Sequence, residues 1–136
     1  MKKQIGLVLL MVLLFIMVGC SATTANLTNA HMTTAVDENG VAIDTVESYT
    51  TDAVEFMVVA ELNNAPANTI VTFVWTYVTE NEYITEAVVD SGDEGSEINL
   101  YSNLTLGSAW PVGEYKVDIY IDEKEEPDST VSFTVN

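Results

Sequence analysis

Apolar and polar residues alternate through most of the chain after residue 29. The clearest early example lies between residues 53 and 62, where one face consists of Val54, Phe56, Val58, Ala60 and Leu62. Successive side chains of a β-strand point to opposite faces of a sheet, so a period of two residues predicts a half-buried strand. We therefore expect these five residues to face a core.

Similar segments follow to the end of the chain, separated about every ten residues by clusters of Asn, Asp, Gly and Pro. Strands are expected over residues 30–36, 53–62, 69–79, 82–90 and 97–104, and then on both sides of a turn at 122–128. Residues 37–40 supply a turn, and 41–46 continue along the edge of the first strand. The other inward residues are Val71, Phe73, Trp75, Tyr77, Ile98, Leu100, Leu104, Tyr115, Val117, Ile119, Ile121, Val131, Phe133 and Val135. This spacing favours an antiparallel all-β fold of about seven to eight strands.

The first 19 residues have a different pattern. Residues 1–4 carry two lysines and no acid, and every residue from 5 to 18 is apolar or glycine. A helix that crosses about 30 Å of hydrocarbon needs about 20 apolar residues, and this run is shorter. A basic start and a short apolar run are typical of an export signal, so we predict that residues 1–19 are a cleaved signal peptide.

The apolar run ends with Ile16-Met17-Val18-Gly19-Cys20, which resembles the lipobox of bacterial lipoproteins. The resemblance implies cleavage before Cys20 and attachment of acyl chains such as palmitate to its thiol. Several chains are sufficient for stable anchoring, because each buried CH₂ contributes about 0.8 kcal/mol. Cys20 is the single cysteine, so the chain forms no internal disulfide. Ser21 stands where an aspartate would resemble an inner-membrane retention signal, which favours the outer membrane or the cell surface.

Charge restricts the partners of the processed chain. Removal of residues 1–19 leaves 117 residues, of which 20–29 are small and polar and are expected to form a tether to one domain over 30–136. This part keeps two lysines, at 116 and 124, against 21 acids, a formal net charge of −19. Such a field repels phosphate backbones and favours cationic partners, so we expect no nucleic-acid partner.

Three short motifs lie near the end of the chain. Trp110, Pro111, Gly113, Tyr115 and Val117 form a Trp-Pro-x-Gly-x-Tyr-x-Val sequence, Tyr120 and Asp122 form a Tyr-x-Asp sequence, and Phe133 and Val135 form a final Phe-x-Val sequence. These motifs resemble the corner, the hairpin and the last strand of immunoglobulin-like domains of bacterial and archaeal surface lipoproteins. Residues 62–69 and 74–77 are similar to the second and third strands of the same group. The resemblance implies an immunoglobulin-like, fibronectin III-like β-sandwich.

The resemblance also implies packing roles. Tyr115 would form a tyrosine corner, Trp75 would be the core tryptophan, and Val117 stands where antibody domains carry a disulfide cysteine. The chain departs from the group in its hairpin at 122–128, which is longer and more acidic than the usual tight turn. This hairpin, which contains Lys124, is expected to be exposed and free of metal.

Candidate catalytic groups are few. His31 is the single histidine and has no nucleophile or second metal ligand near it in the sequence, and Cys20 is expected to be acylated. A carboxylate pair could cleave glycosides, but among 21 acids such a pair is unspecific. We therefore expect that the protein is not an enzyme and that it needs no cofactor.

Calcium is the one metal that the sequence brings into question. Asp90, Asp93, Glu94 and Glu97 surround two glycines in one loop, and Ca²⁺ prefers carboxylate and carbonyl oxygens. Their spacing is not that of an EF-hand. A solvated acidic loop that prevents edge-to-edge strand pairing is the preferred interpretation.

Among the aromatic residues, Tyr83 and Tyr120 are expected to face outward. The sequence thus favours a lipid-anchored module of the cell envelope that binds or assembles with an envelope or surface protein without catalysis. The alternatives are an acidic structural or protective lipoprotein without a dedicated ligand, a calcium-dependent adhesion module and a small carboxylate-based hydrolase.

Overall fold

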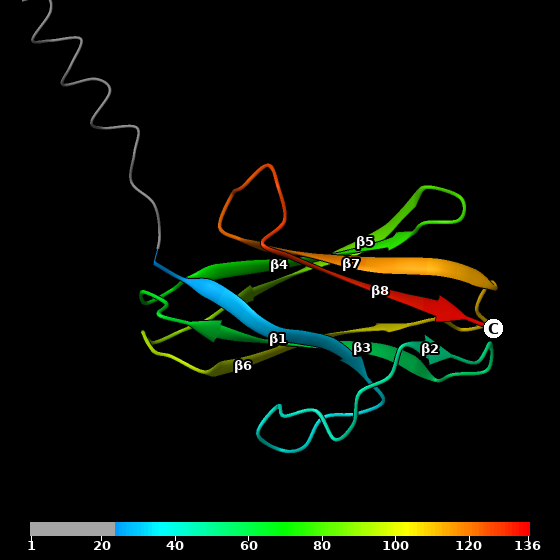
Figure 1. Ribbon diagram of the computed structural model, residues 1–136, viewed down its shortest axis with the longest axis horizontal. Coiled ribbons are helices and arrows are strands. Elements are labelled where there is room, and N and C mark those ends of the chain that lie inside the picture. The colour runs from blue at the N-terminus through cyan, green and yellow to red at the C-terminus, as the bar shows by residue number, and fades with distance from the viewer. Residues whose placement is uncertain (1–23) are drawn as a thin grey trace, which may run out of the picture.

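Two β-sheets packed face to face make up the computed structural model, which describes residues 24–136 (Figure 1). The strands are β1 (Asn26–Thr33), β2 (Ser48–Tyr49), β3 (Glu55–Asn63), β4 (Ile70–Tyr77), β5 (Glu82–Asp90), β6 (Ile98–Thr105), β7 (Gly113–Ile121) and β8 (Ser129–Val135). One sheet has the order β1-β3-β6 and the other has the order β2-β8-β7-β4-β5. All neighbours are antiparallel except β2 and β8. The predicted immunoglobulin-like β-sandwich is confirmed.

The core lies between the sheets and consists of the side chains that the alternation predicted. Phe56, Val58, Leu62, Val71 and Phe73 are almost completely buried. Tyr77, Ile98 and Val131 are half-buried at the margins of the core. The prediction was wrong for Val54, which is 83% exposed. A turn closed by Ala53 N donating to Thr50 O precedes β3, so Val54 lies outside the regular alternation of the strand.

The first strand begins earlier than the sequence predicted. Asn26 and Leu27 pair with Asn63 and Leu62 of β3, so residues 26–29, which were assigned to the tether, belong to the sheet. Backbone hydrogen bonds along β3 do not require apolar side chains, and for this reason the alternation did not reveal the strand. A bulge follows where Asn29 has a φ of 55°. Cys20 and the predicted signal peptide 1–19 lie outside the described residues.

Residues 34–47 connect the two sheets and fold over the outer face of the three-stranded sheet (Figure 1). We call this segment the excursion. The predicted edge strand over 41–46 is not formed, and isolated bridges join Met32 to Val46 and Val36 to Ala42 instead. On the outer face of β3, Met57 and Val59 are 7% and 5% exposed. The strand is therefore covered on both faces, which explains why its sequence is apolar on both.

The corner before β7 has the hydrogen bond that the resemblance implied. The Tyr115 hydroxyl donates to the Pro111 carbonyl over 2.6 Å, and the ring is 2% exposed. Burial raises the pKa of Tyr115 to about 12. The core tryptophan, Trp75, is also buried and donates through Nε1 to Ser102 Oγ over 3.1 Å. Within residues 24–136, no helix is long and apolar enough to cross a bilayer.

Replacing Tyr115 by Phe is expected to lower the free energy of unfolding by about 1 kcal/mol at pH 7, because the Pro111 carbonyl loses its donor. The raised pKa favours the neutral phenol in the folded state, so wild-type stability should fall as the pH rises from about 10 towards 12. The variant should lose this part of the alkaline sensitivity. Urea unfolding at several pH values measures both effects. Tyr83→Phe, at a 57% exposed position, is the control and should change the free energy by less than about 0.5 kcal/mol.

Candidate functional site: a groove over the three-stranded sheet

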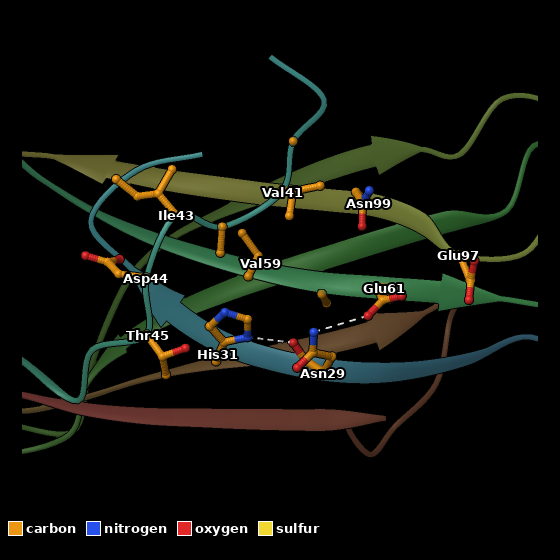
Figure 2. A pocket seen from close by; sticks show the side chains of 13 residues that line it. Asn29, His31, Val41, Ile43, Asp44, Thr45, Val59, Glu61, Glu97 and Asn99 are labelled. Carbon is orange, nitrogen blue, oxygen red and sulfur yellow. Dashed lines mark hydrogen bonds between the residues drawn. The ribbon is translucent and has the colours of Figure 1, made fainter. Parts of the chain in front are cut away.

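A groove of about 590 Å³ lies between the excursion and the outer face of the three-stranded sheet (Figure 2). This volume falls within the range of about 300–1,000 Å³ that is usual for ligand pockets. The excursion provides one wall, and β1, β3 and β6 provide the rest. The residues that line the groove include His31, Val41, Ile43, Val59, Glu61 and Glu97.

A turn at the tip of the excursion fixes the wall that this segment provides. The Asp37 carboxylate accepts hydrogen bonds from Asn39 N and Val41 N over 2.8 and 3.0 Å. Asp37 N donates in turn to Val41 O over 2.9 Å. Gly40 adopts a φ of 76°, which favours glycine, so the predicted turn over 37–40 is confirmed.

Asp44 fastens the other end of the excursion to β1. Its Oδ1 accepts from Thr33 Oγ1 over 2.6 Å and from Thr34 N over 2.8 Å, and its Oδ2 accepts from Thr34 Oγ1 over 2.6 Å. These donors stabilise the ionised carboxylate, and the bond from Thr33 contributes most to lowering the pKa of Asp44 below 3.8. Beside this clamp, the buried Tyr49 hydroxyl donates to Thr33 O over 2.6 Å. The groove wall is therefore held in place before any ligand binds.

The groove combines aliphatic and acidic groups. Val41 and Ile43 are 45% and 63% exposed, although large apolar side chains are usually buried. Figure 2 shows Glu61 and Glu97 towards the same end of the groove, away from Asp44. Glu61 accepts a bond from Asn29 Nδ2 over 3.2 Å, whereas the Glu97 carboxylate has no hydrogen-bond partner in the described part of the chain.

His31 lies in the groove, and its Nδ1 is 2.8 Å from the Asn29 carbonyl (Figure 2). A carbonyl only accepts, so Nδ1 carries the proton and Nε2 is left as an acceptor in the neutral ring. Activation of a hydroxyl nucleophile needs a base within hydrogen-bond reach of it, and the contact that His31 makes is to a carbonyl. The arrangement is suited to holding a ligand by hydrogen bonds and apolar contact.

The four residues predicted for calcium are divided between two places. Asp90 ends β5 and caps its own turn, because Oδ1 accepts from Gly92 N over 2.8 Å. Asp93 and Glu94 are exposed in the following loop, whereas Glu97 lines the groove. Among residues 24–136, no group of three or more His, Cys, Asp or Glu side chains is placed to hold a metal ion.

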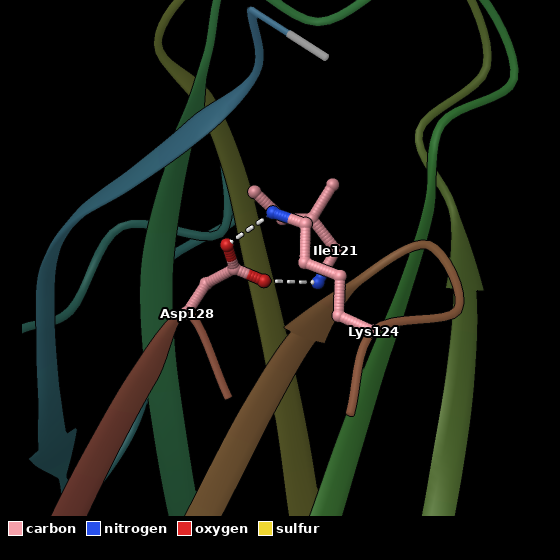
Figure 3. A network of polar contacts seen from close by, with 3 residues as sticks. All are labelled: Ile121, Lys124 and Asp128. Atoms are coloured by element: carbon pink, nitrogen blue, oxygen red, sulfur yellow. Dashed lines mark hydrogen bonds and ion pairs between the residues drawn. The ribbon is translucent and has the colours of Figure 1, made fainter. Parts of the chain in front are cut away.

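Asp128 makes two contacts that hold the acidic hairpin between β7 and β8. Asp128 Oδ2 accepts from Ile121 N over 2.7 Å, and Oδ1 pairs with Lys124 Nζ over 2.6 Å (Figure 3). The remaining lysine, Lys116, pairs with Asp118 over 3.2 Å. Both lysines of the described residues are thus bound to a neighbouring carboxylate, and neither reaches the groove.

The sequence pointed to single residues of this site but not to the groove. His31 and Glu97 were noted for other chemistry, and Val41 and Ile43 were assigned to a strand. The sequence analysis did not identify Tyr101 as an outward aromatic residue, although its side chain is 47% exposed. Tyr120, which was expected to face outward, is half-buried. The apolar outer face of β3 was the available signal, because it requires a cover that the rest of the sheet does not supply.

A second hollow, of about 560 Å³, lies beside β8 and is a less suitable candidate. It is lined by Glu47, Glu114 and Asn136 and reaches Tyr115 and Phe133. Both rings are 2% exposed, so they belong to the core and offer little contact area to a ligand.

Asp44→Ala is expected to open the excursion without unfolding the sandwich. Amide hydrogen exchange of Val41 and Val46 should become roughly tenfold faster than in wild type at pH 7. Because the folded pKa of Asp44 is lowered, the clamp is fully present above pH 3.8 and is lost as the pH falls through the lower value. The ratio of variant to wild-type rates should therefore shrink towards one as the pH falls through the lowered pKa of Asp44. Asp93→Ala serves as the control, and an equal effect there would contradict the clamp.

Calcium should raise the melting temperature of the full-length protein no more than magnesium does at matched ionic strength. The reason is that both ions screen the same dispersed carboxylates. Calorimetric unfolding in each salt makes the comparison. A saturable, calcium-selective rise would restore the metal site at Asp90, Asp93, Glu94 and Glu97.

No protein-family model matches the chain, and no curated protein matches it. Among solved structures, 84% of the chain superposes on 98% of an immunoglobulin-like protein from Pseudomonas aeruginosa, with a TM-score of 0.56 and 9% sequence identity. In a second comparison, 90% of the chain superposes on alkylpurine DNA glycosylase AlkC from Pseudomonas fluorescens, bound to DNA containing an abasic site analog. The TM-score is 0.54 and the sequence identity is 12%. The chain covers only 33% of that glycosylase. At these identities the similarity shows the fold alone, and that fold is the immunoglobulin-like β-sandwich.

Proposed function

We propose that the protein is a lipid-anchored module of the cell envelope that binds a partner through its immunoglobulin-like domain without catalysing a reaction. The observation that carries the proposal is the position of Cys20. It follows a short apolar run and a lipobox-like sequence, and the first strand of the sandwich begins only six residues later, at Asn26. Export, acylation and a folded domain directly outside the membrane account for this order.

The short link supports a fixed orientation of the domain. Three residues lie between Cys20 and Thr24, so even a fully extended link between the two spans only about 14 Å. Thr24 Oγ1 donates to Asn64 O over 3.1 Å, beside the bridge between Ala65 and Gly95. An acylated Cys20 would hold the end of the domain that carries the β3–β4 turn and the acidic β5–β6 loop close to the lipid.

Binding is supported by the preformed groove and by its exposed aliphatic side chains. The Asp37 turn and the Asp44 clamp fix the excursion over the sheet, and rigid sites lose less conformational entropy when a ligand binds. Ile43 is largely exposed to solvent in this groove, so packing within the domain does not explain an isoleucine at this position. A partner that covers it gives a physical reason for its presence.

An acidic envelope protein without a dedicated ligand is the second candidate, and one observation favours it. The described residues expose many carboxylates, and both of their lysines are held in ion pairs. Such a surface resists association with other acidic surfaces and stays solvated. Specific binding in the groove distinguishes the two functions.

The anchor is tested by expressing the full chain in a bacterial host fed with an alkyne analogue of palmitate. Wild type should carry the label, and its mass should correspond to a chain that starts at Cys20. Cys20→Ser should lose the label to background and retain residues 1–19, because the acylated thiol is required for processing. Ser21→Ala is the matched control and should be labelled as wild type. Labelling that survives Cys20→Ser would refute the lipid anchor.

A further inference from the structure

We infer that the groove recognises an extended segment of a partner protein in which a lysine or arginine stands next to an aliphatic residue. This rests on the proposed function and adds the chemistry of the partner. The groove carries two features that the fold itself does not use, an exposed aliphatic wall and an unbalanced acidic end.

The aliphatic wall consists of Val41 and Ile43, with Val59 beneath them on β3. Val59 is already buried at 5% exposure, so the excursion fulfils its covering role without Ile43. Ile43 nevertheless leaves 63% of its surface in solvent. Covering this side chain would remove apolar area from water, which favours a ligand that brings an aliphatic group.

The acidic end consists of Glu61 and Glu97. Neither forms an ion pair within residues 24–136, where Lys116 and Lys124 are held by Asp118 and Asp128. With both of these lysines held elsewhere, a basic side chain of a partner would complement this end. A second copy of the chain is a poor source, because its formal charge of −17 would repel the first.

One long cationic side chain satisfies both features. Arginine and lysine lay their aliphatic stems along apolar surfaces while the charged head stays near polar groups. The guanidinium fork of arginine also matches the geometry of a carboxylate. His31 Nε2 and the side chain of Asn99 remain available to the polar groups of the same ligand.

A peptide segment fits the groove better than a small cation. The volume of about 590 Å³ exceeds what one cationic head group occupies, and the groove runs over the strands of the sheet between the excursion and β1 (Figure 2). An aliphatic neighbour in the partner sequence would fill the space beside Val41 and Ile43. Affinity should therefore depend on both residue types in the ligand.

The test uses the full-length lipidated protein in nanodiscs of neutral phosphatidylcholine, with fluorescent peptides of eight residues read by anisotropy. One peptide carries two arginines and two leucines, a second replaces the leucines by serine, and a third replaces the arginines by glutamate. Spermine is the competitor that has charge without aliphatic side chains. The first peptide should bind at least roughly tenfold more tightly than the others in 150 mM salt, where unspecific attraction is screened.

Variants with matched charge locate the binding. Glu61→Gln with Glu97→Gln removes two charges from the groove, and Glu123→Gln with Glu125→Gln removes two from the exposed hairpin. The groove pair should weaken binding of the first peptide at least roughly tenfold, and the hairpin pair less than about twofold. Ile43→Ser should also weaken binding, whereas Val54→Ser, at another exposed aliphatic position outside the groove, should not.

Equal weakening by the two charge pairs would overturn the proposal, because it would show attraction by the overall field. Displacement of the peptide by equimolar spermine, or binding that ignores the leucines, would overturn it as well. Absence of peptide binding to a protein that is still acylated at Cys20 would remove the groove ligand and leave the anchor intact. Failure of acylation itself is read from the label on Cys20, so the two proposals fail by different measurements.

Discussion

Contact of the Phe56 ring with aromatic rings from four other segments is the interaction on which the sandwich depends. Phe56 is fully buried, and its ring centroid lies 3.9 Å from Trp110, 4.8 Å from Tyr49, 5.0 Å from Phe133 and 5.6 Å from Tyr115. It thereby joins β3 of the small sheet to β2, β7 and β8 of the large sheet. Such pairs contribute about 0.5–1.5 kcal/mol each beyond apolar burial. Together these ring contacts connect the two sheets across the core.

The outer face of the three-stranded sheet is partly apolar and is covered by the excursion, and the groove lies between the two. Three strands present a narrow outer face on which Met57 and Val59 would be exposed without cover. Residues 34–47 supply the cover while they carry the chain from one sheet to the other. Because the Asp37 turn and the Asp44 clamp make the segment stand as a wall, it leaves a hollow lined by Ile43 and Glu61. One segment thus covers the sheet and forms a wall of the groove.

Local pattern was sufficient to predict the strands whose inner faces alternate, such as β3 and β7, whereas the corner at Tyr115 was predicted from the resemblance to immunoglobulin-like domains. It failed at Asn26–Asn29, where pairing depends on the backbone of β3, and at Val54, where a turn interrupts the strand. The groove was beyond prediction for a different reason. His31, Ile43 and Glu97 are far apart in sequence, and only the path of the excursion brings them into one hollow. Glu97 was accordingly grouped with Asp90 because the two are close in sequence. In the structure, Asp90 caps its own turn, whereas Glu97 lines the groove.

We propose that ligand recognition belongs to the groove rather than to the acidic surface as a whole. Methyl and amide NMR spectra of the isotope-labelled full-length protein, recorded during titration with the arginine–leucine peptide, test this most directly. Shifts should concentrate on the Val41, Ile43 and Val59 methyl groups and on the amides of Glu61 and Glu97. Shifts spread over the hairpin at 122–128 and the loop at 90–95, with the methyl groups of Val41 and Ile43 unchanged, would contradict the account.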